Sequence, residues 1–210
     1  MRFLLVVCAL ASSLAFADSP RVLLLWDVQN EQTEALAKSL RTSGAEVVLS
    51  DTPGPGFNGE NPPLANFDVV VHLNGTTYMT DMNPAGQRAL VSFVERGGGY
   101  VHHEWNAYML SVHMFVGLRE LILFDRTSGY GPGAVTVTKV PTEKQQHPVI
   151  WEIPKSFTMN GASNIGFAHK FAEYPVQVLA KIRAATTPSR CVSCAWAASS
   201  ASTTRGIGTA

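Results

Sequence analysis

Two short, continuous apolar runs constrain the fold of this chain more than any other feature. They are Arg21–Asp27 (RVLLLWD) and Phe67–Leu73 (FDVVVHL). Runs of this length without alternation are typical of strands that are buried on both faces, as in parallel sheets. The chain therefore needs elements that cover both faces of a sheet.

The segments between these runs supply such elements. Gln29–Ser43 has apolar residues at helical spacing, and Gly44 follows it as a stop signal. Ala45–Leu49 is predicted to be a second strand. A further helix is predicted to begin at Asn83-Pro84, with proline at the first helical position.

A turn of three glycines, Gly97–Gly99, follows that helix and leads into a short strand at Tyr100-Val101. Glycine adopts positive φ without steric cost, which suits a helix end and a sharp reversal. The alternation of strands and helices predicts an α/β, flavodoxin-like three-layer fold with a mostly parallel central sheet. With the strands numbered along the chain, the expected order across the sheet is 2-1-3-4.

The remaining segments are less regular. We predict a surface loop over Asp51–Pro63, a helix over Ala107–Leu118, an edge strand over Ala134–Val140 and a strand over Val176–Ile182. Residues 184–210 contain no Asp, Glu or Lys and are mostly Ala, Ser and Thr. We expect this tail to be disordered or out of frame, which would leave the domain incomplete at its C-terminus; a natural flexible tail is the alternative.

The N-terminus has the three parts of a secretory signal. Arg2 precedes the apolar run Phe3–Leu10, and Ala15-Phe16-Ala17 matches a cleavage site. We predict a signal peptide over residues 1–17, a domain over 18–183, and a secreted or periplasmic location without a stable membrane span after cleavage. An uncleaved anchor or a buried strand is the alternative.

Composition limits the class of partner. The chain has 210 residues, 46% of them hydrophobic, and zero formal net charge. This suits one globular domain and gives no basic surface for nucleic acid. The composition leaves the oligomeric state open, a homo-oligomer included.

Polar side chains follow three of the predicted strands. Asp27 ends the first, His72 and Asn74 end the third, and His102, His103 and Glu104 end the fourth. Ligands of open α/β sheets bind at the carboxyl ends of the strands. These side chains are therefore expected to share one crevice.

Within this set, His103 and Glu104 are the predicted catalytic pair, because imidazole and carboxylate supply acid-base function near neutral pH. Asp27, His72, Asn74 and His102 are the predicted ligand-binding residues. The alternatives are that the histidines are hydrogen-bonded core residues, that Glu104 caps the following helix, and that Asp27 caps the helix after the first strand.

A divalent metal is a further hypothesis. His72, His102 or His103, Glu104 and Asp27 are ligand types for zinc or iron. The chain has no compact motif such as His-Glu-x-x-His, so the cofactor stays unknown.

The order of these motifs resembles the ThuA-like (trehalose utilisation) family of the class I glutamine amidotransferase-like superfamily. The matching features are the Val-Leu-Leu-Leu-Trp and Phe-Asp-Val-Val-Val strands, the Gly-Gly-Gly-Tyr-Val turn, His147-Pro148 and the Val178-Leu179 strand. The resemblance spans about residues 20–182. It implies a flavodoxin-like sheet and a role in carbohydrate metabolism.

The chain departs from this family at two places. Amidotransferases have a nucleophilic Cys, and ThuA-like proteins usually a His, where this chain has Glu104. Family members also have an acidic pair where this chain has Met159–Asn164. We therefore do not expect glutamine hydrolysis through a Cys-His pair.

Three hypotheses about function follow. The first is a secreted enzyme, of a hydrolase or isomerase type, acting on a carbohydrate-like small molecule. The second is a non-catalytic sugar-binding module on the same scaffold. The third is a non-functional, truncated remnant.

Overall fold

The computed structural model describes the chain over residues 19–102, 104–122, 124–126, 135–139, 153–159, 166–168, 180–184 and 192–194. The expected signal peptide, His103 and the His147-Pro148 motif lie outside these ranges.

The first half of the described chain alternates strands and helices. The elements are β1 (Arg21–Leu25), α1 (Glu31–Thr42), β2 (Glu46–Leu49), β3 (Val69–His72), α2 (Pro84–Glu95), β4 (Gly99–His102) and α3 (Glu104–Ser111). Short 3-10 turns lie at η1 (Gly54–Gly56), η2 (Leu64–Asn66) and η3 (Val116–Leu118).

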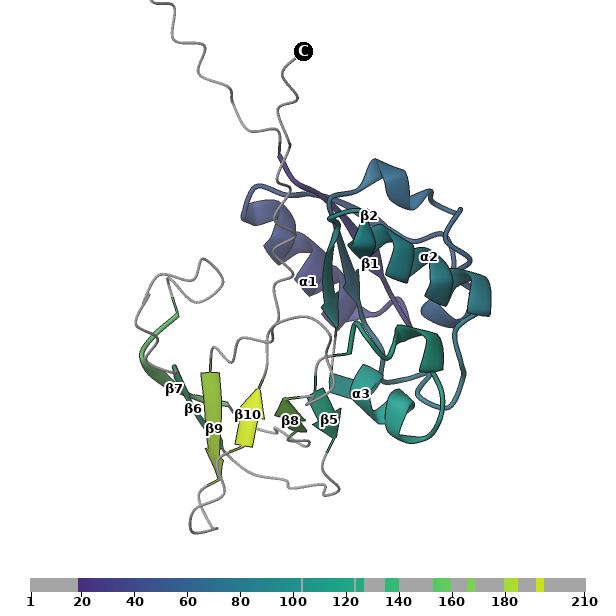
Figure 1. Cartoon of the computed structure of the whole chain (residues 1–210). Coiled ribbons are helices and arrows are strands. Elements are labelled where there is room, and N and C mark those ends of the chain that lie inside the picture. Colours follow the sequence, from purple (N-terminus) through teal and green to yellow (C-terminus); the bar gives the residue numbers. More distant parts are fainter. Residues whose placement is uncertain are drawn as a thin grey trace, which may run out of the picture.

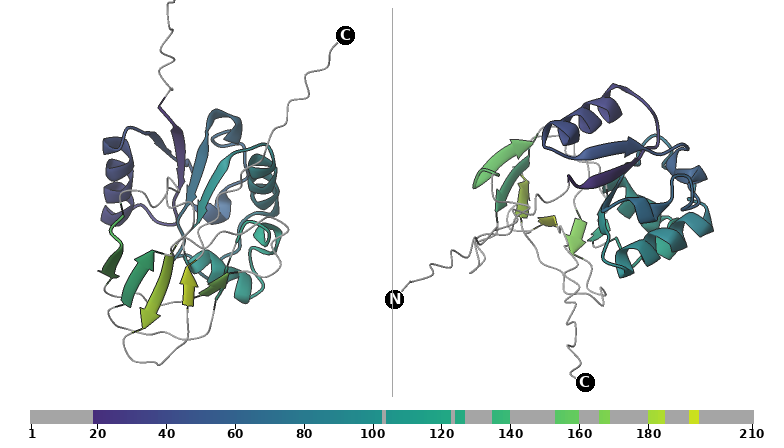
Figure 2. Two further views of the ribbon diagram at one scale, coloured as in Figure 1. Left: turned by 60° about the vertical axis from the view of Figure 1, so that its left-hand side comes forward. Right: turned by 90° about the horizontal axis from the view of Figure 1, so that it is seen from above.

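The central sheet has four parallel strands in the order β2-β1-β3-β4. The predicted α/β class and strand order are therefore confirmed. Figures 1 and 2 show α1 on one face of this sheet and α2 on the other. Among the described strands, β4 lies at an edge of this sheet.

Each face of the sheet has its own core. Val22, Leu24 and Val47 pack with Ala37 of α1. Leu23, Leu25 and Val70 pack on the opposite face with residues of α2, α3 and the loops. Alternate residues of β1 therefore enter different cores, as the two-residue period of a strand requires, which explains why the run is apolar throughout.

The helix ends follow their sequence signals. Asn30 caps α1, because its Oδ1 accepts a hydrogen bond from the backbone N–H of Thr33 at 3.0 Å. Asn83 caps α2 in the same way, with Pro84 in the first turn. Gly44 and Gly97 follow the two helices with φ of 95° and 98°, values that favour glycine.

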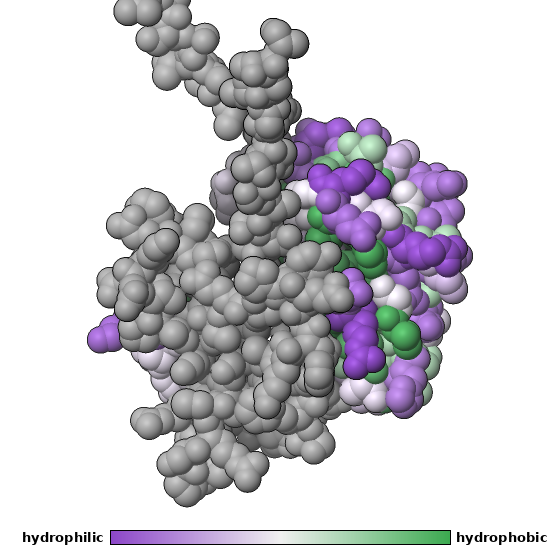
Figure 3. Space-filling model, viewed as in Figure 1, coloured by the Kyte–Doolittle hydropathy of each residue, from purple (hydrophilic) through white to green (hydrophobic). Residues whose placement is uncertain are grey.

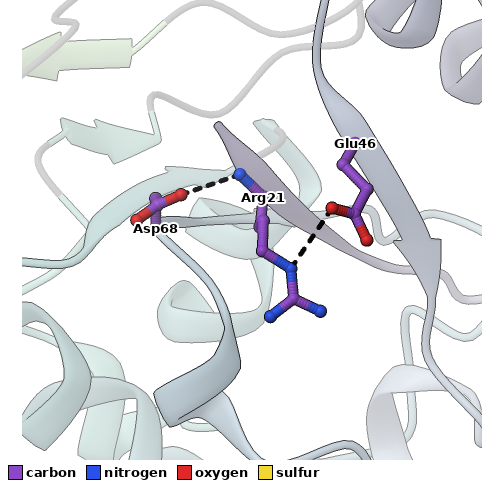
Figure 4. A network of polar contacts seen from close by, with 3 residues as sticks. All are labelled: Arg21, Glu46 and Asp68. Atoms are coloured by element: carbon purple, nitrogen blue, oxygen red, sulfur yellow. Dashed lines mark hydrogen bonds and ion pairs between the residues drawn. The ribbon is translucent and has the colours of Figure 1, made fainter. Parts of the chain in front are cut away.

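The amino-terminal edge of the sheet is held by polar contacts of Arg21 (Figure 4). Its backbone N–H donates to Oδ2 of Asp68 at 2.7 Å, and its Nε lies 3.4 Å from Oε2 of Glu46. The guanidinium also lies over the Phe67 ring, 5.5 Å from the centroid. The ion pair is solvent-exposed, so it contributes at most about 1 kcal/mol.

The loop expected over Asp51–Pro63 is not only a surface loop. Phe57 is fully buried in the core. A Cβ on Gly86 of α2 would lie 2.2 Å from the carbonyl oxygen of Phe57, so glycine allows the loop to approach the helix. A loop rich in Gly and Pro can therefore contribute a core residue.

The helix expected over Ala107–Leu118 is interrupted. α3 ends at Ser111, and His113 and Phe115 have φ of 63° and 53°. This left-handed backbone turns the chain before η3 and buries Phe115 in the core. The expectation of one continuous helix is wrong.

The later strands form separate sheets. β6 (Val135–Lys139) pairs antiparallel with β7 (Ser156–Met159) and β9 (Ala180–Ala184), and β9 pairs with β10 (Val192–Cys194). β5 (Phe124–Arg126) pairs with β8 (Gly166–Ala168). β6 is thus an interior strand, contrary to the predicted edge strand.

β10 lies within the 184–210 segment, for which the sequence predicts disorder. The rest of that segment, apart from Ala184 in β9, lies outside the described ranges. The prediction for the tail as a whole stays a prediction.

Candidate functional site

The three neighbouring strands β1, β3 and β4 end level with one another. The register pairs Leu25 with His72, and His72 with His102. Asp27 follows β1 by two residues and Asn74 follows β3 by two residues. The backbone positions of all four predicted ligand-binding residues therefore lie at the carboxyl edge of the sheet.

His72 lies at the centre of a buried polar cluster. Its Nδ1 is 2.8 Å from the hydroxyl of Tyr100 and 2.9 Å from Nδ2 of Asn106. Nδ2 of Asn106 also lies 3.4 Å from the Tyr100 hydroxyl. We refer to these three residues, His72, Tyr100 and Asn106, as the His72 cluster.

The partners of Nδ1 indicate the tautomer of His72. In this orientation of the Asn106 amide, its nitrogen donates to Nδ1, which then carries no proton. In a neutral imidazole the proton is then on Nε2. This arrangement holds the ring in one orientation.

The His72 ring is enclosed on its other sides. It is 1% exposed, and the Phe115 ring lies 5.5 Å from it. An ideal Cβ on Gly54 would lie 3.2 Å from Nε2, which is a tight contact. Direct binding of a ligand to His72 would therefore require a rearrangement of the residues that surround it.

Tyr100 is half-buried, but its hydroxyl lies between His72 and Asn106. Burial raises the pKa of this hydroxyl, and the hydrogen bond from Asn106 offsets part of the effect. Tyr100 is therefore a neutral hydrogen-bonding group near neutral pH.

Two buried amide atoms at this edge have no hydrogen-bond partner within the described structure. They are Nδ2 of Asn74 and Oδ1 of Asn106. The Oδ1 of Asn74 accepts from the backbone N–H of Gly75 at 2.9 Å and from the Thr77 hydroxyl at 3.4 Å. Unmade hydrogen bonds of this kind are destabilising, by about 1–3 kcal/mol each.

Asp27 connects the end of β1 to the turn after β3. Its Oδ1 accepts from the backbone N–H of Val28 at 2.8 Å, and its Oδ2 accepts from that of Thr76 at 2.6 Å. Asn30, and not Asp27, caps α1, so the helix-capping alternative for Asp27 is wrong. Asp27 is partly exposed, which leaves its carboxylate accessible at this edge.

His102 lies beside His72 on the same face of the sheet. Its ring is stacked on that of Tyr100, with centroids 6.0 Å apart and an interplanar angle of 28°. It is partly buried. Its ligand-binding role stays a prediction.

The predicted catalytic pair also stays a prediction. His103 lies outside the described residues. Glu104 is the first residue of α3, but its side chain also lies outside the description. The capping alternative for Glu104 therefore also stays a prediction.

The metal hypothesis gains no support from the described side chains. Among them, no group of three or more His, Cys, Asp or Glu residues could hold a metal ion. The same part of the chain contains no helix with the length and apolar character to cross a membrane.

Sequence analysis missed several residues at this edge. Tyr100 and Asn106 complete the His72 cluster, and Tyr78, Trp105 and Tyr108 form a group of touching aromatic rings. The spacing of Trp105 and Tyr108, three residues apart on a helix, was a usable signal for the second group.

Comparisons with known proteins give little additional information. No model of a known family matches the sequence, and no curated protein matches it. Among solved structures, the chain is similar to a Thermoplasma acidophilum protein described as a subunit of GMP synthase, with 11% identity and a TM-score of 0.47. The alignment covers 81% of this chain and 80% of the other. The assignment of the fold class depends on the sheet order alone.

Proposed function

We propose that this protein is a secreted ThuA-like domain that binds a carbohydrate-related small molecule at the carboxyl ends of β1, β3 and β4, and acts on it. The observation that carries the proposal is the level ending of these strands, which brings the backbone of Asp27, Asn74 and His102 to one edge. This edge is where open α/β sheets bind ligands. The proposal of secretion depends on the signal pattern of residues 1–17.

The proposed chemistry does not use a cysteine. The chain has three cysteines, at positions 8, 191 and 194, and none of them follows the glycine turn directly. The polar groups after that turn are His103 and Glu104, which we propose as the acid-base pair. Hydrolysis of glutamine is therefore not expected, and an assay for released ammonia checks this.

A non-catalytic sugar-binding module is the second candidate. The departure from the ThuA-like pattern at Glu104 favours it, because family members usually have a His there. His72 is 1% exposed, so it could contact a ligand only after a structural change. Binding by the partly exposed Asp27 needs no such change.

One experiment separates the two candidates. Wild type and Glu104→Gln are incubated with trehalose, cellobiose and their oxidised derivatives, while binding is followed by calorimetry and turnover by chromatography. An enzyme turns over a sugar and loses turnover, but not binding, in Glu104→Gln. A binding module binds without turnover in both proteins. Absence of binding to every sugar by a folded wild type contradicts both candidates.

A further inference from the structure

Three aromatic side chains form a continuous group beside Asp27. Tyr78 lies in the turn after β3, whereas Trp105 and Tyr108 lie on α3. The ring centroids are 5.3 Å apart for Tyr78 and Trp105, 5.8 Å for Tyr78 and Tyr108, and 5.2 Å for Trp105 and Tyr108. We refer to these three residues as the aromatic surface.

The aromatic surface is accessible to solvent. Tyr78 is 40% exposed, and the neighbouring Met79 is 57% exposed. Trp105 and Tyr108 are partly exposed. In the face shown in Figure 3, the described part of the chain carries hydrophilic and hydrophobic residues side by side. A group of exposed aromatic rings is costly to keep in water and is typical of a binding surface.

The spacing of the rings indicates how a ligand would lie. A guest between two ring faces needs about 7 Å, twice the carbon contact distance of about 3.5 Å. The observed centroid distances are shorter, so the rings pack on one another and leave no space for a guest. The ring planes are inclined by 43° for Tyr78 and Trp105, 58° for Tyr78 and Tyr108, and 80° for Trp105 and Tyr108, so the three rings do not form one flat face. A ligand would therefore stack on one exposed ring, and Tyr78 is the most exposed of the three. An aromatic cage around a quaternary ammonium is disfavoured.

A hydrogen-bond acceptor lies at the rim of this surface. An ideal Cβ on Gly75 would be 3.5 Å from Cδ1 of Trp105 and 3.8 Å from Oδ2 of Asp27. The indole and the carboxylate thus flank the same glycine. Each carboxylate oxygen accepts one backbone N–H and has a second lone pair that can accept from a ligand hydroxyl.

The charge of the two contributing segments indicates the class of ligand. Residues 74–82 and 104–111 contain no Lys or Arg, and their charged residues are Asp81 and Glu104. A phosphate or carboxylate ligand would find no cation in these segments, whereas its charge would oppose that of Asp27. A neutral polyol fits better.

We propose that the exposed ring of Tyr78, supported by Trp105 and Tyr108, stacks against the apolar face of a neutral pyranose ring, whose hydroxyls donate to Asp27. A pyranose with equatorial hydroxyls has C–H groups on its flat faces and donors at its rim, which matches an aromatic surface with a carboxylate beside it. The inference deepens the proposed function and rests on it, because it specifies where and how the sugar binds.

Calorimetric titration of the full-length protein tests the inference. The probes are trehalose and cellobiose, with glucose 6-phosphate and choline chloride as anionic and cationic controls. Tyr78→Ala is expected to weaken sugar binding about tenfold, since a lost stacking contact of about 1.4 kcal/mol has that effect. Trp105→Ala should also weaken binding, because the Trp105 ring packs against Tyr78 and supports it. Trp105→Phe should retain most of the affinity, and Asp27→Asn should reduce it.

Val116→Ala is the matched control, because Val116 is a 57% exposed apolar residue on η3, outside the aromatic surface. Circular dichroism checks that each variant is folded. Sugar binding that is unchanged in Trp105→Ala and Tyr78→Ala would overturn the inference while leaving the proposed function in place. Failure of the wild type to bind either sugar would overturn both the inference and the proposed function. Tighter binding of choline than of either sugar would overturn the inference, because it would show that the surface prefers a cation to a neutral sugar.

Discussion

The His72 cluster and the aromatic surface occupy the same edge of the sheet, but they differ in access to solvent. His72 is 1% exposed and is held by Tyr100 and Asn106, whereas Tyr78 is 40% exposed. The buried cluster contains the imidazole of His72, which is a common acid-base group. The open surface contains aromatic rings, which are suited to binding a ligand. Proximity to the carboxyl edge is therefore not sufficient to identify a ligand-binding residue; burial must be considered as well.

The largest difference between the two regions is expected in stability. Phe115→Ala removes a buried ring that packs on His72, and it should lower the free energy of unfolding by about 3–5 kcal/mol. Tyr78→Ala in the open region should lower it by only about 1 kcal/mol, because this ring is 40% exposed and packs on two others. Urea denaturation of the two variants measures both values. Similar losses in the two variants would show that the aromatic surface is part of the core.

Two glycines give a smaller and more local contrast. Gly54→Ala places a methyl group 3.2 Å from Nε2 of His72 and should destabilise the protein by about 1–3 kcal/mol through overpacking. Gly75→Ala meets ordinary contacts at 3.5 Å and should be close to neutral, because it also reduces the freedom of the unfolded chain. Thermal unfolding compares the pair. Equal destabilisation would mean that the open region is as tightly packed as the sealed one.

The smallest expected effect concerns pH. Burial raises the pKa of Tyr100 above its ordinary value of about 10, so the unfolded chain releases this proton first as the pH rises. Stability should therefore fall above about pH 10, by up to about 1.4 kcal/mol per pH unit, until folded Tyr100 also ionises. Tyr100→Phe should lack this pH dependence of stability. At neutral pH its free energy of unfolding should be about 1 kcal/mol lower, because one hydrogen bond is missing.

Denaturant midpoints measured from about pH 9 to about pH 11, on either side of the ordinary tyrosine pKa, give this slope. Tyr78→Phe is the matched control, because it removes a hydroxyl from an exposed ring, and it is expected to follow the wild-type curve. A Tyr100→Phe curve with the wild-type slope would show that the Tyr100 hydroxyl does not contribute.

Much of the central sheet could be predicted from sequence because its signals are local. The apolar runs define β1 and β3, Asn30 and Asn83 begin the helices, and Gly97 follows α2. The strand order is inferred from the flavodoxin-like fold that the alternation of strands and helices indicates, and the structure adds the register in which the strands end level. The convergence of Asp27, Asn74 and His102 at one edge follows from that order.

The burial of the site residues could not be predicted in the same way. His72 points into the core because Val70 on the same strand does, but only the tertiary structure shows that Phe115 and the Gly54 loop cover it. Phe115 reaches it through a left-handed turn that helical periodicity does not reveal. Phe57 likewise enters the core from a loop whose composition indicated only surface.

The contact between distant segments also had no local signal. Tyr78 meets Trp105 and Tyr108 because the turn after β3 and the start of α3 follow adjacent strands. The aromatic surface depends on strand adjacency and side-chain packing together.

A nitrogen-15 NMR titration with cellobiose tests the central claim, that the open surface and not the sealed cluster receives the ligand. The indole N–H of Trp105 and the backbone amides of Gly75 and Thr76 should shift with one common affinity, while the side-chain amide of Asn106 should stay unchanged. Shifts confined to Asn106 and the backbone of His72, with no change at Trp105, would contradict the account.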